Sequence, residues 1–187
     1  MAKGRAAAPK SLFKSSRQIF YFSFFILWIC IDVALLGLVS QQLHKYGNTY
    51  TNYPTGEYYH ALGLLLFATI FALIIGLFHW VLNLGMFLVI FIANGVFFGT
   101  GAGIIEGTPF GHGLQCPNPV SAFPTAWQPF VSQCSRVTAI EGLAWAMFAL
   151  SVIGLFYAFT DKFSIKSQRN ILYDVEVPIE PATKEVA

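Results

Sequence analysis

The sequence predicts an all-α membrane protein, a bundle of four transmembrane helices. Two observations support this prediction. The chain of 187 residues is 56% hydrophobic and only 11% charged, whereas a soluble domain carries about 25% charged residues. It also contains four separate apolar runs, each near the ~20 residues that a helix needs to cross a bilayer. This composition excludes disorder for most of the chain and argues against a soluble enzyme.

The four apolar runs predict helices over about 19–39, 61–80, 84–105 and 137–159. Glycine and β-branched residues inside these runs do not argue against helix, because lipid forces the backbone to satisfy its own hydrogen bonds. The helical domain then spans 18–160 and follows a basic segment, 1–17. After it comes a tail, 161–187, which turns acidic, contains proline and is expected to be disordered.

Basic residues close to the spans predict that both termini face the cytoplasm, with two loops on the outside. Five of them precede the first helix without an intervening acid: Lys3, Arg5, Lys10, Lys14 and Arg17. The two outward loops offer only Lys45 and Arg136. The short turn near 81–83 is then cytoplasmic. The five N-terminal residues are available to anionic lipid, whose attraction contributes about 1 kcal/mol per charge near the surface. The alternative is that they only enforce the topology. The sequence does not separate the two roles.

The second outward loop, 106–136, holds Cys116 and Cys134. Two cysteines in one loop on the oxidising side predict a disulfide, which would contribute about 3 kcal/mol. Two unpaired thiols are the less favoured alternative. The loop is rich in proline, which leaves little room for regular structure, and its aromatic residues offer apolar surface for packing onto the helix ends. Cys30, inside the first helix, is expected to be a small buried apolar residue.

Three glycines recur every four residues in the third helix: Gly95, Gly99 and Gly103. This small-xxx-small pattern lets another helix approach closely. The partner is either a helix of the same bundle, which is the simpler account, or a second copy of the chain. The run GTGAG does not indicate phosphate binding, because neither a preceding strand nor a suitably placed lysine accompanies it.

Polar side chains within or beside the spans are the candidate functional site, because each is costly in lipid. Helix rise places Asp32 and Glu141 at a similar depth in the outer half of the bilayer. The remaining candidates are Glu106, Arg136 and His60 near the outer edge and Asn94 in the middle of the third helix. The functional interpretation is a proton or cation site. We favour the alternative, a structural salt-bridge and hydrogen-bond cluster, since no acid–histidine chain continues towards the cytoplasm.

The sequence contains no recognisable catalytic motif: no HExxH, no CxxC and no nucleophile elbow. The histidines are scattered over loops and helix ends, and His112 in a GHG run is weak evidence for a metal site. We therefore expect a protein without enzymatic activity, cofactor, metal or nucleic-acid partner.

These features together resemble the MARVEL-domain tetraspan proteins, particularly their fungal members. The entry to the fourth helix, CSRVTAIEGLAWAMFAL from Cys134 to Leu150, is similar to the Cys, Arg, spaced alanines and tryptophan that open the last helix of that family. The run RQIFYFSFFILWICIDVALLGLVS is more loosely similar to the family's first helix. The resemblance covers the whole spanning region, from Arg17 to about Phe159.

The resemblance implies non-enzymatic work in the plasma membrane, as an organiser of lipid microdomains or a companion of a larger membrane protein. The implied partners are membrane lipids, a second copy of the chain or another integral membrane protein. The alternative is a small transporter or channel subunit that uses Asp32, Glu141 and Arg136. The first function predicts lateral assemblies without ion flux, and the second predicts flux that Asp32→Asn abolishes.

Overall fold

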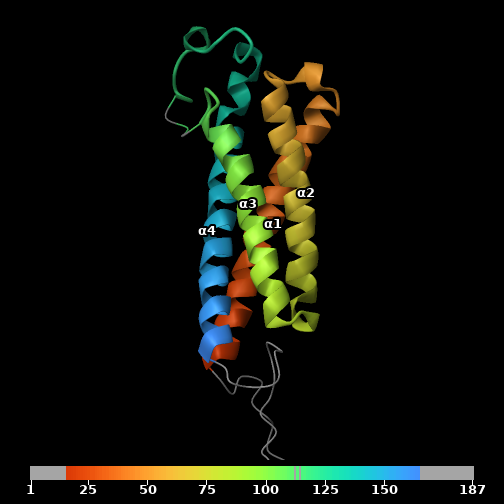
Figure 1. Ribbon diagram of the computed structural model, residues 1–187. Coiled ribbons are helices and arrows are strands. Elements are labelled where there is room, and N and C mark those ends of the chain that lie inside the picture. Colours follow the sequence, from red (N-terminus) through yellow and green to blue (C-terminus); the bar gives the residue numbers. More distant parts are fainter. Residues whose placement is uncertain (1–15, 112, 114, 165–187) are drawn as a thin grey trace, which may run out of the picture.

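The computed structural model describes residues 16–111, 113 and 115–164, which contain four long antiparallel helices (Figure 1). They are α1 (Ser16–Tyr46), α2 (Gly56–Phe78), α3 (Leu84–Glu106) and α4 (Cys134–Ser164). Each is long and apolar enough to cross a membrane, and these residues include no strand. The predicted four-helix membrane bundle is confirmed.

The bundle has two distinct ends. α1 begins and α4 ends at one of them, here called the terminal end, where the 3₁₀ helix His79–Val81 also connects α2 to α3 (Figure 1). The opposite end, called the loop end, carries the segments 47–55 and 107–133. Each helix packs against the next one along the chain, and α4 packs against α1, so the four helices form a closed ring.

α1 continues about two turns beyond its predicted end near residue 39. The polar run 40–46 contains neither glycine nor proline, so nothing in it stops a helix. Gly47 then ends the helix with a φ of +76°, and its N–H donates to the Leu43 carbonyl at 2.8 Å. This left-handed turn suits glycine, which lacks a Cβ. The prediction ended the helix at its last apolar residue, whereas helix propensity carries it to the first breaker.

α2 and α4 also begin earlier than their hydropathy predicts. Thr55 precedes α2, and its side-chain oxygen accepts a hydrogen bond from the Tyr58 N–H at 3.3 Å. This contact satisfies one of the free donors of the first turn. α4 begins at Cys134 and continues to Ser164. The longer helices extend past the apolar spans and carry polar groups of the loop end on regular helical structure.

The terminal half of the core is aromatic. Trp28 is fully buried, and its ring lies 5.9 Å from the ring of Phe24 and 5.7 Å from that of Phe91. Its indole N–H donates to the Ala72 carbonyl at 3.4 Å. A Cβ on Gly154 would lie 2.7 Å from Cζ of Phe91. These five residues, called the Trp28 layer, join all four helices at one level.

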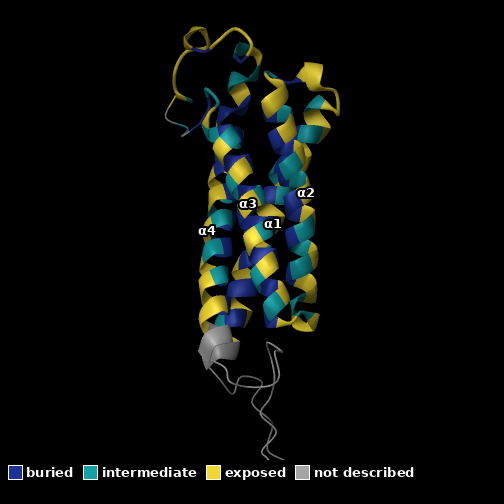
Figure 2. Cartoon of the chain, in the orientation of Figure 1, coloured by how far each residue is buried: buried dark blue, intermediate teal, exposed yellow. Residues whose placement is uncertain are grey.

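Exposed residues lie where the helices face away from one another (Figure 2), and many of them are large and apolar. Large exposed side chains occur on every helix, among them Val33, Phe67, Val89, Val96 and Phe156. In a bilayer these side chains meet acyl chains rather than water. Cys30, expected to be buried, is exposed on α1. It lies two residues from the buried Trp28, which places it on the opposite side of the helix.

The loop 107–133 is folded onto the helix ends. It contains two 3₁₀ helices, Val120–Ala122 and Gln128–Gln133. The ring of Trp127 packs 5.6 Å from Tyr58, and the ring of Phe130 packs 5.1 Å from Tyr46. The expected packing of the loop aromatics onto the helices is therefore present.

Candidate functional site

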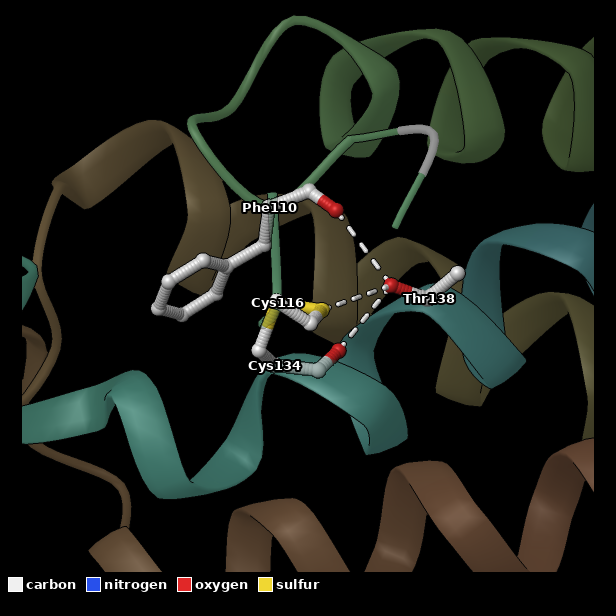
Figure 3. Close-up of a disulfide and its surroundings, with 4 residues drawn as sticks. All are labelled: Phe110, Cys116, Cys134 and Thr138. Atoms are coloured by element: carbon white, nitrogen blue, oxygen red, sulfur yellow. Dashed lines mark hydrogen bonds between the residues drawn. A yellow bond between two sulfur atoms is a disulfide. The ribbon is translucent and has the colours of Figure 1, made fainter. Parts of the chain in front are cut away.

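A disulfide joins Cys116 to Cys134, as expected from the sequence (Figure 3). It ties the loop to the first residue of α4. The Thr138 hydroxyl lies 3.0 Å from the Cys134 carbonyl, 3.3 Å from the Phe110 carbonyl and 3.8 Å from Sγ of Cys116. Because a disulfide sulfur carries no proton, the single hydroxyl proton of Thr138 is shared among these acceptors. Thr138 thus holds the loop against α4 beside the disulfide (Figure 3).

Two glycines allow the chain to pass close to Thr138. Gly113 has a φ of +65°, and a Cβ there would lie 2.6 Å from Cγ2 of Thr138. A Cβ on Gly111 would run into the Glu106 carbonyl oxygen. The two glycines of the GHG run therefore serve a tight backbone turn. His112 between them, the weak metal candidate, lies outside the described residues.

Each of the four helices contributes one buried polar side chain to a single level of the bundle, one turn from the Trp28 layer towards the loop end: Asp32, Thr69, Asn94 and Ser151. The level follows from contacts of the neighbouring turn, because side chains three or four residues apart share a helix face. Asp32 follows Trp28 by four residues, and Asn94 follows Phe91 by three. A Cβ on the adjacent Gly95 would lie 3.7 Å from Cβ of Ser151. This set is called the polar layer.

Two members of the polar layer are satisfied within their own helices. Thr69 donates to the Leu66 carbonyl at 2.9 Å, and Ser151 donates to the Met147 carbonyl at 2.8 Å. Both carboxyl oxygens of Asp32 and both polar atoms of the Asn94 amide have no hydrogen-bond partner among the described residues. Unpartnered polar atoms are expensive in the membrane interior, so Asp32 and Asn94 are the strongest functional candidates.

Apolar side chains close the polar layer on both sides. The Trp28 layer covers it towards the terminal end. Towards the loop end it is covered by one fully buried side chain from each helix, namely Leu35, Leu65, Phe98 and Met147. The last set is called the Leu35 layer. Asp32 and Asn94, each 0% exposed, therefore lie between two apolar layers.

The structure separates Asp32 from Glu141, which the sequence placed at a similar depth. Gly99 and Phe148 lie at one level of the bundle, because a Cβ on Gly99 would lie 3.0 Å from Cδ2 of Phe148. Glu106 follows Gly99 by seven residues and Glu141 precedes Phe148 by seven, so both lie nearer the loop end. Glu141 is thus about 15 Å from the polar layer along the bundle, by helix rise. Because α1 continues to Tyr46, Asp32 lies much deeper below its helix end than predicted.

The other charged residues of the predicted site lie towards the loop end, away from the polar layer. Arg136 is half-buried at the loop end, within electrostatic reach of the Tyr58 hydroxyl. Glu106 and the buried Glu141 lie at the same end, and His60 is exposed on α2. The expected cluster of six is therefore two groups, a loop-end group of charges and the polar layer, with His60 outside both. The side chains of Lys3, Arg5, Lys10, Lys14 and Arg17 lie outside the described residues.

Sequence reasoning missed several buried polar residues. Thr69 and Ser151 were not singled out, although each lies within a predicted apolar span. Gln42 follows the predicted end of the first helix, yet it is buried on α1 beside Tyr58. Hydropathy gives no signal for Thr69 and Ser151, because a hydroxyl that bonds to its own helix is compatible with an apolar span. It gives none for Gln42, because α1 continues past its apolar run.

At the loop end, Tyr46, Tyr53 and Tyr59 form a packed cluster. Tyr53 is buried, its hydroxyl donates to the Gly47 carbonyl at 2.7 Å, and its ring lies 5.0 Å from that of Tyr59 and 5.8 Å from that of Tyr46. Burial, with a smaller contribution from the Tyr59 and Tyr46 phenols, raises the pKa of Tyr53 above its ordinary value of 10.0. The cluster joins the segment 47–55 to α1 and α2.

Two glycines of the α3 pattern face α4, and a glycine outside the pattern faces α2. Gly95 and Gly99 face α4, whereas Gly103 is exposed and has no atom within 4 Å of a built Cβ. Each step of four residues turns about 40° beyond a full helical turn, so the third glycine rotates away from α4. Gly101 makes the close approach to α2 instead, since its Cβ would lie 2.5 Å from Cδ2 of Leu65.

We expect Gly99→Leu to lower the free energy of unfolding by about 1–3 kcal/mol, because the added side chain overpacks against Phe148. Gly103→Leu is the matched control on the same helix and should change stability little, since its side chain enters open space. Equilibrium unfolding of the purified chain in mixed micelles measures both. Equal losses in the two variants would contradict the packing of α3 against α4 described above.

No protein-family model, no curated protein and no solved structure matches this chain. The candidate site is therefore defined by its geometry. It consists of an enclosed polar layer in the middle of the bundle and a disulfide-tied loop at one end.

Proposed function

We propose that the protein is a non-enzymatic integral membrane protein that organises a plasma-membrane microdomain, or accompanies a larger membrane protein, through lateral helix packing. The observation that carries this proposal is the closed core. The Trp28 layer, the polar layer and the Leu35 layer join the four helices at successive levels. A bundle closed in this way meets its partners through its lateral surface and its loops. The resemblance to MARVEL-domain tetraspan proteins supports the same function.

The proposal places the loop end outside the cell and both termini in the cytoplasm. A disulfide at the loop end suits an oxidising compartment. The basic residues that precede α1 suit the cytoplasmic side, where they are available to anionic lipid. A plasma-membrane location meets both requirements.

The groove between α3 and α4 is the part of the lateral surface best suited to another helix. It is open and mostly apolar, with Gly95 and Ser151 among its lining residues beside Phe91, Val96 and Leu155. The apolar walls of the groove suit the van der Waals packing that drives helix association in lipid. We propose a second copy of the chain as the occupant, because the exposed helix faces of this chain are themselves apolar.

We expect Val96→Trp to weaken self-association about tenfold, since overpacking a helix contact costs about 1–3 kcal/mol. Val96 lines the groove and is 59% exposed, so the change leaves the core intact. Ile74→Trp is the matched control, because Ile74 is 51% exposed on α2, away from the groove. Energy transfer between labelled copies in lipid vesicles, titrated against the protein-to-lipid ratio, measures the association.

Wild-type association that Val96→Trp leaves unchanged would exclude the groove as the contact between copies. A wild-type chain that remains monomeric at every protein-to-lipid ratio would contradict self-association itself. Copurification in mild detergent then tests the other form of the proposal, a larger integral membrane protein as the partner.

A second candidate function is a small transporter or channel subunit. Asp32 favours it, because this carboxyl group within the membrane has no hydrogen-bond partner among the residues that the structure describes. Glu141 and Arg136 support this candidate less, since they lie towards the loop end at a different level of the bundle. Ion flux into liposomes that Asp32→Asn abolishes would favour this function over the scaffold.

A further inference from the structure

We propose that the polar layer is a buried binding site for one monovalent cation, a proton or an alkali metal ion. Asp32 supplies the negative charge, and Asn94 supplies an amide at the same level of the bundle. This inference goes beyond lateral packing and does not depend on it, because it concerns the interior of a single bundle.

The first argument is the cost of a bare charge. Asp32 is 0% exposed, and neither of its carboxyl oxygens has a hydrogen-bond partner among the described residues. An isolated carboxylate between two apolar layers is among the least favourable groups that a protein can bury. The folded bundle therefore requires a positive charge at Asp32, either as a proton on the carboxyl group or as a bound metal ion.

The second argument is the set of oxygen atoms at the same level. The Asn94 amide is also fully buried and has no hydrogen-bond partner within the described part of the chain, so its oxygen is available as an acceptor. Thr69 and Ser151 use their protons on carbonyls of their own helices, which leaves lone pairs on both hydroxyl oxygens. A carboxylate, an amide oxygen and two hydroxyls, one from each helix, are the oxygen ligands that a hard cation takes. An amide oxygen equally accepts a hydrogen bond from a protonated carboxyl group.

The third argument is that no fixed positive charge among the described side chains lies at the level of Asp32. The polar groups that the other helices present at its level are Thr69, Asn94 and Ser151, and none of them titrates. The titratable side chains described on these helices and on the α2–α3 connection lie at other levels: Glu57, Tyr58, Tyr59, His60 and His79, then Glu106, then Arg136, Glu141 and Tyr157. On α1 itself, the nearest is Cys30 on the exposed side. A mobile cation is therefore the group that neutralises Asp32.

The test is the thermal unfolding midpoint of the full chain in lipid nanodiscs, measured over a pH series in choline, sodium and potassium chloride. In choline we expect the midpoint to fall by several degrees as the pH rises, because a deprotonated Asp32 strands a charge in the core. If sodium or potassium restores the midpoint at high pH, the ligand is an alkali ion. If the three salts give one curve, the ligand is a proton.

Two variants assign the effect to the site. Asp32→Asn removes the ionisable group. Its unfolding midpoint should therefore lose the dependence on pH and on the cation that the wild type shows. Glu57→Gln, at an exposed position in the first turn of α2, should keep the wild-type curves. A wild-type midpoint that is flat in pH and cation, or an Asp32→Asn protein that keeps the full dependence, would overturn the proposal.

An infrared measurement on the wild type covers the case in which Asp32→Asn does not fold. A protonated carboxyl group absorbs at a carbonyl frequency that an ionised carboxylate lacks, and isotope-labelled aspartate separates it from Glu106 and Glu141. A buried aspartic acid band in all three salts at neutral pH indicates a proton. A band that sodium or potassium removes indicates an alkali ion. An ionised aspartate signal alone, with a midpoint that ignores the cation, would contradict the site.

Discussion

Trp28→Ala is expected to lower the free energy of unfolding by about 3–5 kcal/mol, the range for truncating a large aromatic side chain in a core. Trp28 is fully buried, packs on Phe24 and Phe91, and donates to the Ala72 carbonyl. Its removal leaves a cavity where three helices meet. Equilibrium unfolding in mixed micelles, followed by helical circular dichroism, measures the loss.

Trp80→Ala is the matched control for this prediction. Trp80 is 56% exposed on the α2–α3 connection, so its truncation should change stability by no more than about 0.5 kcal/mol. If Trp28→Ala lowered the free energy of unfolding no more than Trp80→Ala does, the packing described for the Trp28 layer would be contradicted.

Removal of the disulfide by Cys116→Ser and Cys134→Ser together is expected to cost about 3 kcal/mol, the value for a closed loop of similar length. The two cysteines are 18 residues apart in the sequence. Without the bridge, the contacts that hold the loop include its aromatic packing and the Thr138 hydrogen bond to Phe110. The loss should appear as a lower unfolding midpoint and as increased exposure of Trp127.

Cys30→Ala is the control, because Cys30 is a free cysteine exposed on α1 and its truncation leaves the core unchanged. Alkylation of the native wild-type chain without reduction should label Cys30 at most. Labelling of both loop cysteines would contradict the bridge. If that labelling required access from the cytosol, it would also contradict the proposed orientation.

The number of helices and the disulfide could be predicted because each depends on local information. Hydropathy locates the spans, since lipid leaves the backbone of an apolar run little choice but helix. Cys116 and Cys134 lie in one loop, so their pairing requires no knowledge of the fold. The end of α1 was also readable in principle, because Gly47 is the first strong helix breaker after the span.

The level and surroundings of each polar side chain depend on how four helices slide and rotate against one another, which no single helix specifies. The contact between Trp28 and Phe91 brings Asp32 and Asn94 to one level, and the contact between Gly99 and Phe148 carries Glu141 towards the loop end. Asp32 is therefore enclosed by residues distant in the sequence. The amino-acid order determined that this carboxyl group enters the membrane. The packing of four helices determined that it lies there without a hydrogen-bond partner among the described residues, because side-chain contacts between helices set their relative register.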